Sequence, residues 1–305
     1  MIRSRLALRW RRWWRDRSAR VAAVLIAAAA SLAAAQGPTV EISHRARALH
    51  PGEVVVLEVR ASESFASVRA TAFGSTIRFF AVTADGLWLG LVGIDLTADA
   101  GNHPVLLVAT TADGAAFRRH YTLVVAAKEF PTRQLTVAPN FVSPPSEVLD
   151  RIQREAQRVA SIFRVSSAER LWSGGFLEPV PGNATSSFGR RSVFNGQPRS
   201  PHSGTDFRAA EGTPVQAPSG GRVVLTGDQY FSGQVVILDH GWGLYSYFAH
   251  LSSIDVAEGD VVGPGAVLGK VGATGRVTGP HLHWTVRLNE ARVDPLSLME
   301  MFPEP

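Results

Sequence analysis

Cysteine is absent from this sequence of 305 residues. Its absence excludes a disulfide framework and any metal site built on thiolates. The composition is compatible with an oxidising compartment but does not require one. A chain of this length suggests about two domains with extensions, because single hydrophobic cores stop growing beyond about 250–300 residues.

Basic residues are scarce outside the N-terminus, although the whole chain has a net charge of +5. Residues 1–35 contain eight Arg and a single acid, Asp16, which gives them a net charge of +7. The rest of the chain has 23 basic and 25 acidic residues, a net charge of −2. The body of the protein therefore lacks the basic surface that nucleic-acid-binding proteins use, and no nucleic acid is expected as a partner.

The leader, residues 1–36, predicts export. Arg3 to Arg20 form a basic segment, and Val21–Ala35 form an apolar run of 15 residues that ends in three alanines before Gln36. This pattern favours a cleaved signal peptide. An uncleaved signal anchor stays open, although the run is shorter than the ~20 residues that span a bilayer. Either alternative places the body outside the cytoplasm, in the periplasm, the extracellular space or the cell envelope, and a retained leader would anchor it to the inner membrane through residues 21–35.

Residues 38–127 predict a β-sandwich of immunoglobulin-like type. Short apolar segments are separated by turn signals such as Pro51-Gly52 and Asp113-Gly114. The segments begin at Val54, Ser67, Ile77, Leu87, His103 and His120. The histidines here share no metal spacing, so we expect a spacer or a module that binds the wall or a partner.

Residues 128–180 are expected to link two domains and to contain one helix, over about 146–163. Apolar residues recur there at three-to-four spacing, from Val148 to Phe163. Ser146 is the predicted N-cap. We expect this helix to pack between the two domains; the alternative is that it covers a groove of the C-terminal domain.

Residues 181–305 predict an antiparallel β-domain with a groove, so the whole chain is expected to be mainly β. Its apolar segments begin at Gly221, Gln234, Leu244, Ala266 and His281. Glycines supply the turns between them. No long amphipathic helix is expected after residue 165.

Five residues in this region form a candidate metal centre. His202 and Asp206 are four residues apart around Gly204, and His281 and His283 flank Leu282. On a strand, His281 and His283 point to the same side, while Leu282 and Trp284 point into a core. Imidazole and carboxylate ligands suit zinc, and His250 adds an imidazole for proton chemistry.

The pattern H-x-x-x-D followed at long range by H-L-H resembles the lysostaphin/LytM-type zinc metallopeptidases, which cut peptide bonds in bacterial peptidoglycan. The resemblance extends from about Thr185 to Pro295, includes the glycine-rich run 263–280, and covers roughly a third of the chain. It implies one Zn²⁺ per chain, held by His202, Asp206 and His283. His250 and His281 would then handle protons, with the general base of the pair left open.

The same resemblance places Arg190 and Asn195 beside the groove as candidate substrate-binding residues. It matches His240 to a position that is not a ligand, so we expect a structural role for His240 and for Asp239. Tyr247 and Trp284 are expected in the core. No H-E-x-x-H motif occurs in the sequence, so the two remaining histidines would have to do the work that a glutamate does in that class of protease.

These features predict an exported zinc endopeptidase that hydrolyses peptide cross-links of peptidoglycan. The expected partners are stem peptides or cross-bridges, and the bond that is cut stays open, as does the oligomeric state. The alternative is a non-catalytic LytM-type activator of a cell-wall amidase. The complete set of five site residues favours the enzyme, since degenerate members of the family lack one or more ligands.

Overall fold

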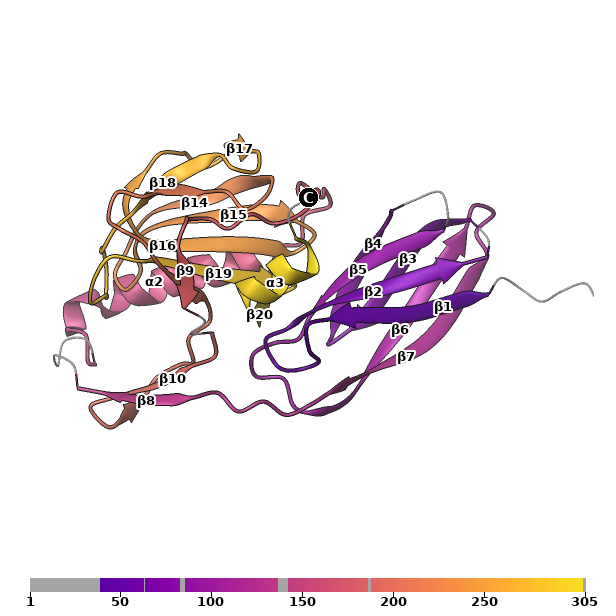
Figure 1. Ribbon diagram of the computed structural model, residues 1–305, viewed down its shortest axis with the longest axis horizontal. Helices are drawn as coiled ribbons and strands as arrows, with labels where there is room; N and C mark the ends of the chain where they lie inside the picture. Colours follow the sequence, from indigo (N-terminus) through magenta and orange to yellow (C-terminus); the bar gives the residue numbers. More distant parts are fainter. Residues whose placement is uncertain (1–38, 63, 83–85, 137–141, 186–187, 304–305) are drawn as a thin grey trace, which may run out of the picture.

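The computed structural model describes residues 39–62, 64–82, 86–136, 142–185 and 188–303. The fold is mainly β, with antiparallel sheets, as predicted (Figure 1). The leader and its two alternatives lie outside the described residues. Within the described ranges, no helix has the length and apolar character needed to cross a bilayer.

The N-terminal strands form two layers around one core (Figure 1). The first layer pairs β1, β2 and β5, the second pairs β3, β6 and β7, and β4 pairs with both β5 and β3. With β1 to β7 lettered A to G, the strand order is that of constant-type immunoglobulin domains, ABED in one sheet and CFG in the other. The difference is that β4, strand D, also pairs with β3 and so joins the two layers. The immunoglobulin-like type therefore stays a prediction. The strands are β1 (Val40–Ala46), β2 (Val54–Ala61), β3 (Phe65–Ala72), β4 (Ser75–Ala81), β5 (Leu87–Gly93), β6 (Gly101–Thr111) and β7 (Ala116–Val125).

Strand β2 is buried on both faces, which joins the sandwich to the C-terminal domain. Val55 and Leu57 lie in the sandwich core, while Val54 and Val56 belong to the core of the second domain. All four are fully buried. A strand half-exposed to water would alternate apolar and polar residues, so a continuous apolar run indicates cover on both sides. The sandwich is therefore a fixed neighbour of the C-terminal domain and not a freely tethered spacer.

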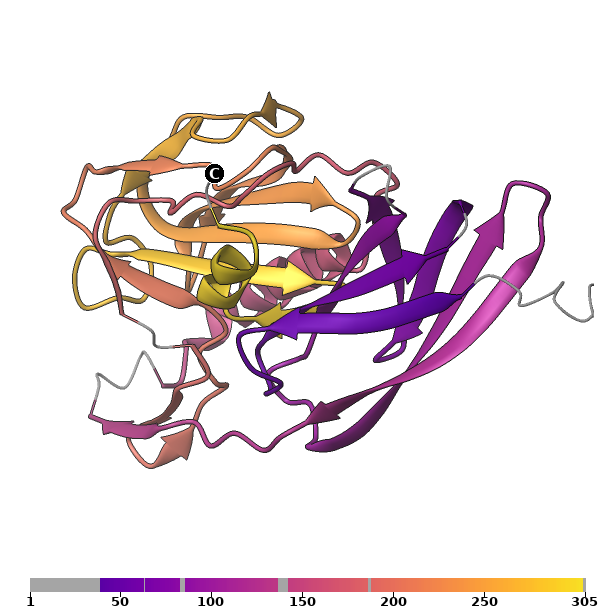
Figure 2. The same ribbon diagram turned by 45° about the vertical axis from the view of Figure 1, so that its right-hand side comes forward.

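The second domain is built on a ten-stranded sheet whose main path is β17-β14-β15-β16-β19-β12-β9. Three strands lie off this path: β18 pairs with β16 and with β13, and β20 pairs with β19. Helix α3 (Pro295–Met301) lies at the junction with the sandwich (Figures 1 and 2). The strands are β9 (Asn183–Thr185), β12 (Thr205–Arg208), β13 (Pro214–Gln216), β14 (Gly221–Gln229), β15 (Gly233–Gly241), β16 (Leu244–Ile254), β17 (Val261–Val262), β18 (Val267–Val271), β19 (Leu282–Leu288) and β20 (Ala291–Val293).

Helix α2 (Ser146–Phe163) occupies the range predicted from its apolar spacing. The prediction of Ser146 as N-cap is wrong, because Pro145 holds the non-helical cap position and no side chain caps the helix. The expected packing between the domains is also wrong. α2 lies on the sheet of the second domain, where Phe163 meets Tyr245 at a ring distance of 5.5 Å and Arg151 pairs with Asp228.

The connection between the domains contains a strand that the sequence analysis missed. β8 (Thr132–Leu135) pairs in parallel with β10 (Arg191–Phe194), and β10 pairs in turn with β11 (Gln197–Pro198). This small sheet stands apart from the large one (Figure 1). It ties the connecting chain to the loop that precedes the candidate metal ligands.

A buried ionic cluster fixes the junction of the two domains. Arg47 Nη2 lies 2.9 Å from Glu53 Oε1 and 2.8 Å from Asp294 Oδ2, and Lys128 Nζ lies 3.3 Å from Glu53. Asp294 Oδ1 also accepts a hydrogen bond from Thr205 Oγ1, next to Asp206. Burial alone would raise the pKa of Glu53, but the hydrogen bonds and charge of Arg47 outweigh it and lower that pKa.

Replacing Arg47 with Met is expected to destabilise the fold by about 3–5 kcal/mol, because two nearly buried carboxylates lose their shared cation. Urea unfolding followed by tryptophan fluorescence measures the change. The matched control is Arg45→Met, which removes the more exposed Arg45–Glu58 pair and should cost no more than about 1 kcal/mol. Equal midpoints for the two variants would show that the cluster does not stabilise the junction.

Candidate metal centre

The pairing of β12 with β19 brings two candidate ligands together. Asp206 and His283 are direct partners in this antiparallel ladder. Along β19, Leu282, Trp284 and Val286 are buried in the core, so His283 points to the opposite face. The strand alternation expected from the sequence is therefore present.

His202 reaches the same point from the loop that precedes β12. Its amide donates to Arg190 O at 2.9 Å, and its carbonyl accepts from Gly189 N at 2.7 Å. Between the two ligands, Gly204 approaches β19 closely: a Cβ there would lie 2.5 Å from Trp284 O. The loop therefore needs glycine at this position to carry His202 over the strand.

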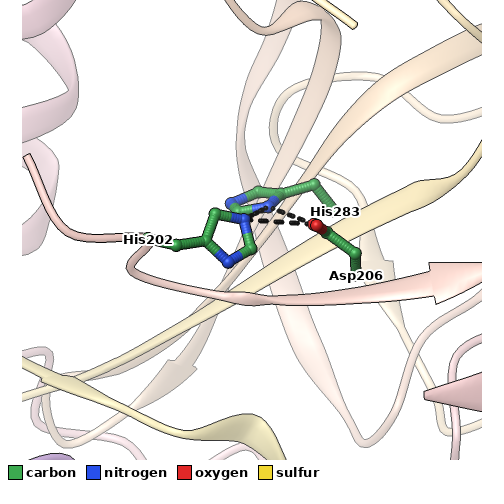
Figure 3. A group of neighbouring side chains, drawn as sticks. All are labelled: His202, Asp206 and His283. Carbon is green, nitrogen blue, oxygen red and sulfur yellow. Dashed lines mark hydrogen bonds and ion pairs between the residues drawn. The ribbon is translucent and has the colours of Figure 1, made fainter. Parts of the chain in front are cut away.

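Three ligand atoms converge at the centre (Figure 3). Asp206 Oδ1 lies 3.1 Å from His202 Nε2 and 2.9 Å from His283 Nδ1, and the two nitrogens are 2.9 Å apart. Donors about 2.1 Å from one tetrahedral ion stand about 3.4 Å apart, so small outward shifts would admit a zinc ion. The donor set fits a divalent metal with an open position.

The electrostatics of the centre keep Asp206 ionised. Burial alone would raise the pKa of its carboxyl, but hydrogen bonds from His202 and His283 outweigh burial and hold that pKa well below its usual range. Burial lowers the pKa of His283. Both residues are thus held in the states that metal ligands require, a carboxylate and a neutral imidazole.

Thr285 supports His283 from behind. Thr285 Oγ1 lies 2.9 Å from His283 Nε2, so once a metal ion binds Nδ1 in place of its proton, the ring can donate an Nε2 proton to this hydroxyl. Such an outer partner fixes the tautomer and the ring orientation of a ligand. Sequence reasoning missed Thr285, although its position two residues after His283 on one strand face was a usable signal.

The other two histidines lie beside the candidate ligands. The His250 and His281 ring centroids are 5.0 Å apart, and His281 Nε2 lies 3.9 Å from Asp206 Oδ1. The Nδ1 of each lies 2.9 Å from a backbone carbonyl, Thr274 O for His250 and Gly279 O for His281. A neutral ring that donates from Nδ1 keeps the Nε2 lone pair for proton transfer.

An irregularity in β16 aims His250 at the centre. Phe248 and Leu251 are both fully buried in the core, whereas His250 lies beside His283, with ring centroids 5.9 Å apart. Strict alternation would send His250 to the side of Phe248; a left-handed backbone with φ of 66° at His250 breaks the alternation. Burial, with a smaller contribution from His283, lowers the pKa of His250 to about 3, so its ring is neutral.

The two candidate substrate residues lie in the loop before His202. Asn195 and Gly196, with φ of 49° and 81°, form the two-residue turn between β10 and β11, which is the Asn-Gly hairpin signal. Arg190 contributes its backbone carbonyl to His202. These backbone contacts place the loop beside the centre, while contact of either side chain with substrate stays a prediction.

Residues expected to be structural lie in the core. His240 is fully buried, with Nδ1 2.7 Å from Gly220 O and Nε2 2.8 Å from Ser246 Oγ. Burial lowers its pKa to about 4. Asp239 is buried and accepts from Gly241 N, and Trp284 is fully buried. Tyr247 is buried as expected but also lines a cavity that reaches His283.

A β-domain in which two histidines and one carboxylate converge beside two further histidines is typical of a metallopeptidase. The sequence model of Peptidase family M23 matches residues 200–295. A Pseudomonas aeruginosa protein whose crystal structure carries the designation peptidase M23 is 37% identical, with a TM-score of 0.64 over 82% of this chain and 95% of that one. The chain belongs to peptidase family M23, which confirms the resemblance drawn from the motif.

Two curated relatives match about a third of the chain. The DD-carboxypeptidase/endopeptidase Mpg of Neisseria meningitidis is 44% identical over 103 residues, which are 34% of this chain and 24% of that protein. The peptidoglycan DD-endopeptidase ShyA of Vibrio cholerae is 45% identical over 84 residues, 28% of this chain and 20% of that protein. The chain thus spans about a quarter or less of the length of these relatives.

Proposed function

We propose that the protein is an exported zinc endopeptidase that hydrolyses peptide cross-links of bacterial peptidoglycan. The observation that carries the proposal is the convergence of His202 Nε2, Asp206 Oδ1 and His283 Nδ1 beside His250 and His281. The names of the relatives, DD-carboxypeptidase/endopeptidase for one and peptidoglycan DD-endopeptidase for the other, support peptidoglycan as the substrate. The basic and apolar leader supports export to the cell envelope.

His202, Asp206 and His283 would hold one zinc ion per chain. When bound, zinc supplies Lewis-acid polarisation of the peptide carbonyl and activation of a water. The chain's own proton chemistry falls to His250 and His281, whose Nε2 atoms are the available bases. One accepts the proton of the attacking water, and the other hydrogen-bonds the developing oxyanion or protonates the leaving amine. Arg190 and Asn195 would border the bound peptide.

Digestion of purified peptidoglycan by residues 37–305, with zinc or with chelator, tests the proposal. Mass spectrometry of the fragments should show chelator-sensitive loss of cross-linked dimers and identify the cleaved bond. A wall left intact by zinc-loaded protein would overturn the enzyme. Adding a wall amidase would then test the activator alternative, in which stimulation survives zinc removal.

Replacing Thr285 with Val is expected to weaken zinc binding by about 10- to 100-fold, because His283 loses the partner that fixes its ring. Thr285→Ser, which keeps the hydroxyl, should restore most of the affinity. Competition with a chromophoric chelator measures the dissociation constants. Thr213→Val is the matched control, since that hydroxyl donates to Ala210 O away from the ligands. Unchanged affinity in Thr285→Val would remove the supporting role.

A further inference from the structure

A cavity of about 400 Å³ runs between helix α2 and the sheet. Its floor includes His283, Thr285 and Arg287 of β19, three residues on one strand face. Tyr247 of β16 adds to the floor. The cavity therefore begins at a metal ligand and follows β19 to Arg287.

Helix α2 supplies the outer wall of this cavity without filling it. Its apolar residues Ala156 and Val159 line the space, and Phe163 alone among its described side chains is buried. Ion pairs at the helix surface, Arg151–Asp228 and Arg158–Glu258, hold the helix in place. An amphipathic helix that merely completed a core would bury its apolar stripe, whereas this one leaves room beside the metal centre.

At the far end of the cavity, Arg287 is a cation on which Asp95 and Glu290 act only as nearby charges. Its Nε is buried with no hydrogen-bond partner, and its Nη1 donates to the backbone carbonyl of Glu290 at 3.2 Å. Within the described ranges no carboxylate forms an ion pair with it, and Asp95 forms its ion pair with Arg292. Burial lowers the pKa of Arg287 to about 10, so the group stays charged at neutral pH. A half-buried charge of this kind is stabilised when an anion joins it.

A packing role explains only part of this arrangement. The Arg287 guanidinium lies 5.2 Å from the centre of the Phe163 ring, which gives a cation–π contact at the end of α2. That contact does not satisfy the N–H donors of the guanidinium: Nη1 donates to Glu290 O, while Nε stays without a hydrogen-bond partner. In-plane donors in a fork are what bind a carboxylate through two hydrogen bonds.

We propose that this cavity is a substrate subsite in which Arg287 binds a free carboxylate of the peptide that is cleaved at the metal centre. The proposal rests on the proposed function. Arg287 follows His283 by four positions on β19, about 13 Å along a strand. The carboxylate therefore belongs to a group several bonds away from the scissile amide. A chain-end carboxylate and the carboxyl group of a diamino acid both supply this chemistry.

The rest of the lining suits an anion. Glu155, the one carboxylate of the helix in the lining, is compensated: Oε1 accepts from Arg151 Nε at 2.6 Å and Oε2 from Tyr230 N at 2.9 Å. The Tyr247 hydroxyl donates to Gln229 Oε1 at 2.8 Å. Apolar side chains of α2 line one wall, and an ion pair beside an apolar wall is stronger than one in bulk water.

The test measures binding in chelator, so that hydrolysis plays no part. Three synthetic cross-linked stem peptides are compared by calorimetry on the full exported protein: one with all carboxylates free, one amidated at the chain end, and one amidated at the diamino acid. The free peptide should bind about 10- to 100-fold more tightly than the version whose relevant carboxylate is blocked. The version that loses affinity identifies the source of the carboxylate.

Arg287→Gln should abolish this preference while leaving the affinity for the matching amide unchanged. Arg154→Gln, the same charge change on the exposed side of α2, should keep the preference. Arg287→Lys retains the charge without the planar pair of N–H donors and should show an intermediate preference for the free carboxylate. This variant tests the subsite if Arg287→Gln does not fold.

Equal binding of the free and amidated peptides by the wild type, or an unchanged preference in Arg287→Gln, would overturn the subsite. Cleavage of the same peptides with zinc is scored separately. Absent cleavage together with carboxylate-selective binding would overturn the proposed function and leave the subsite standing.

Discussion

Replacing Asp206 with Ala is expected to abolish both zinc retention and peptide hydrolysis. Asp206 is the one anionic ligand of the three, and its Oδ1 contacts both His202 and His283. Its removal leaves two imidazoles and no anionic ligand, and such a pair holds a divalent cation poorly. Because the metal supplies several kcal/mol of stabilisation to the transition state, activity should fall by at least about 10³-fold.

Metal analysis after dialysis and digestion of cross-linked peptidoglycan are the two measurements for Asp206→Ala. Circular dichroism checks that the variant folds. Asp255→Ala, which removes an exposed carboxylate elsewhere in the same domain, serves as the control and should keep both zinc and activity. A variant that retained one zinc per chain after dialysis would show that Asp206 is not a ligand.

The sequence predicted those parts of the site that follow from strand alternation. The pattern His281-Leu282-His283-Trp284 indicates two faces of one strand, and the structure places Leu282 and Trp284 in the core. The range of α2 was also predictable, because its apolar spacing is local information. The surface that this helix covers was not, since an amphipathic stripe says that a partner exists but not which one.

The missed features depend on contacts between segments that are far apart in the chain. The parallel pairing of β8 with β10 brings together residues about sixty positions apart, and neither strand alternates clearly enough to be recognised alone. His250 reaches the centre through an irregularity in β16, which no periodicity predicts. One missed feature did have a signal: the unbroken apolar run at the start of β2 is typical of a strand covered on both faces.

Replacing His281 with Ala is expected to leave zinc in place and to lower turnover by about 10²- to 10⁴-fold, the range for loss of a general acid or base. His281 is not one of the three converging ligands, so metal content should match the wild type. Its Nδ1 is fixed 2.9 Å from Gly279 O, which leaves Nε2 for the reacting groups. Metal analysis and steady-state kinetics on a cross-linked peptide measure the two effects. His120→Ala, at an exposed position on the sandwich, is the control.

Comparing His281→Ala with His250→Ala assigns the two roles that geometry leaves equivalent. A substrate with a more acidic leaving amine needs less help from a general acid, so it should rescue the variant that lacks the acid and not the variant that lacks the base. If the two residues act as a unit, the double variant should be little slower than the slower single variant. Wild-type turnover in His281→Ala would show that the proton chemistry assigned to this histidine is wrong, even with His202, Asp206 and His283 holding zinc as proposed.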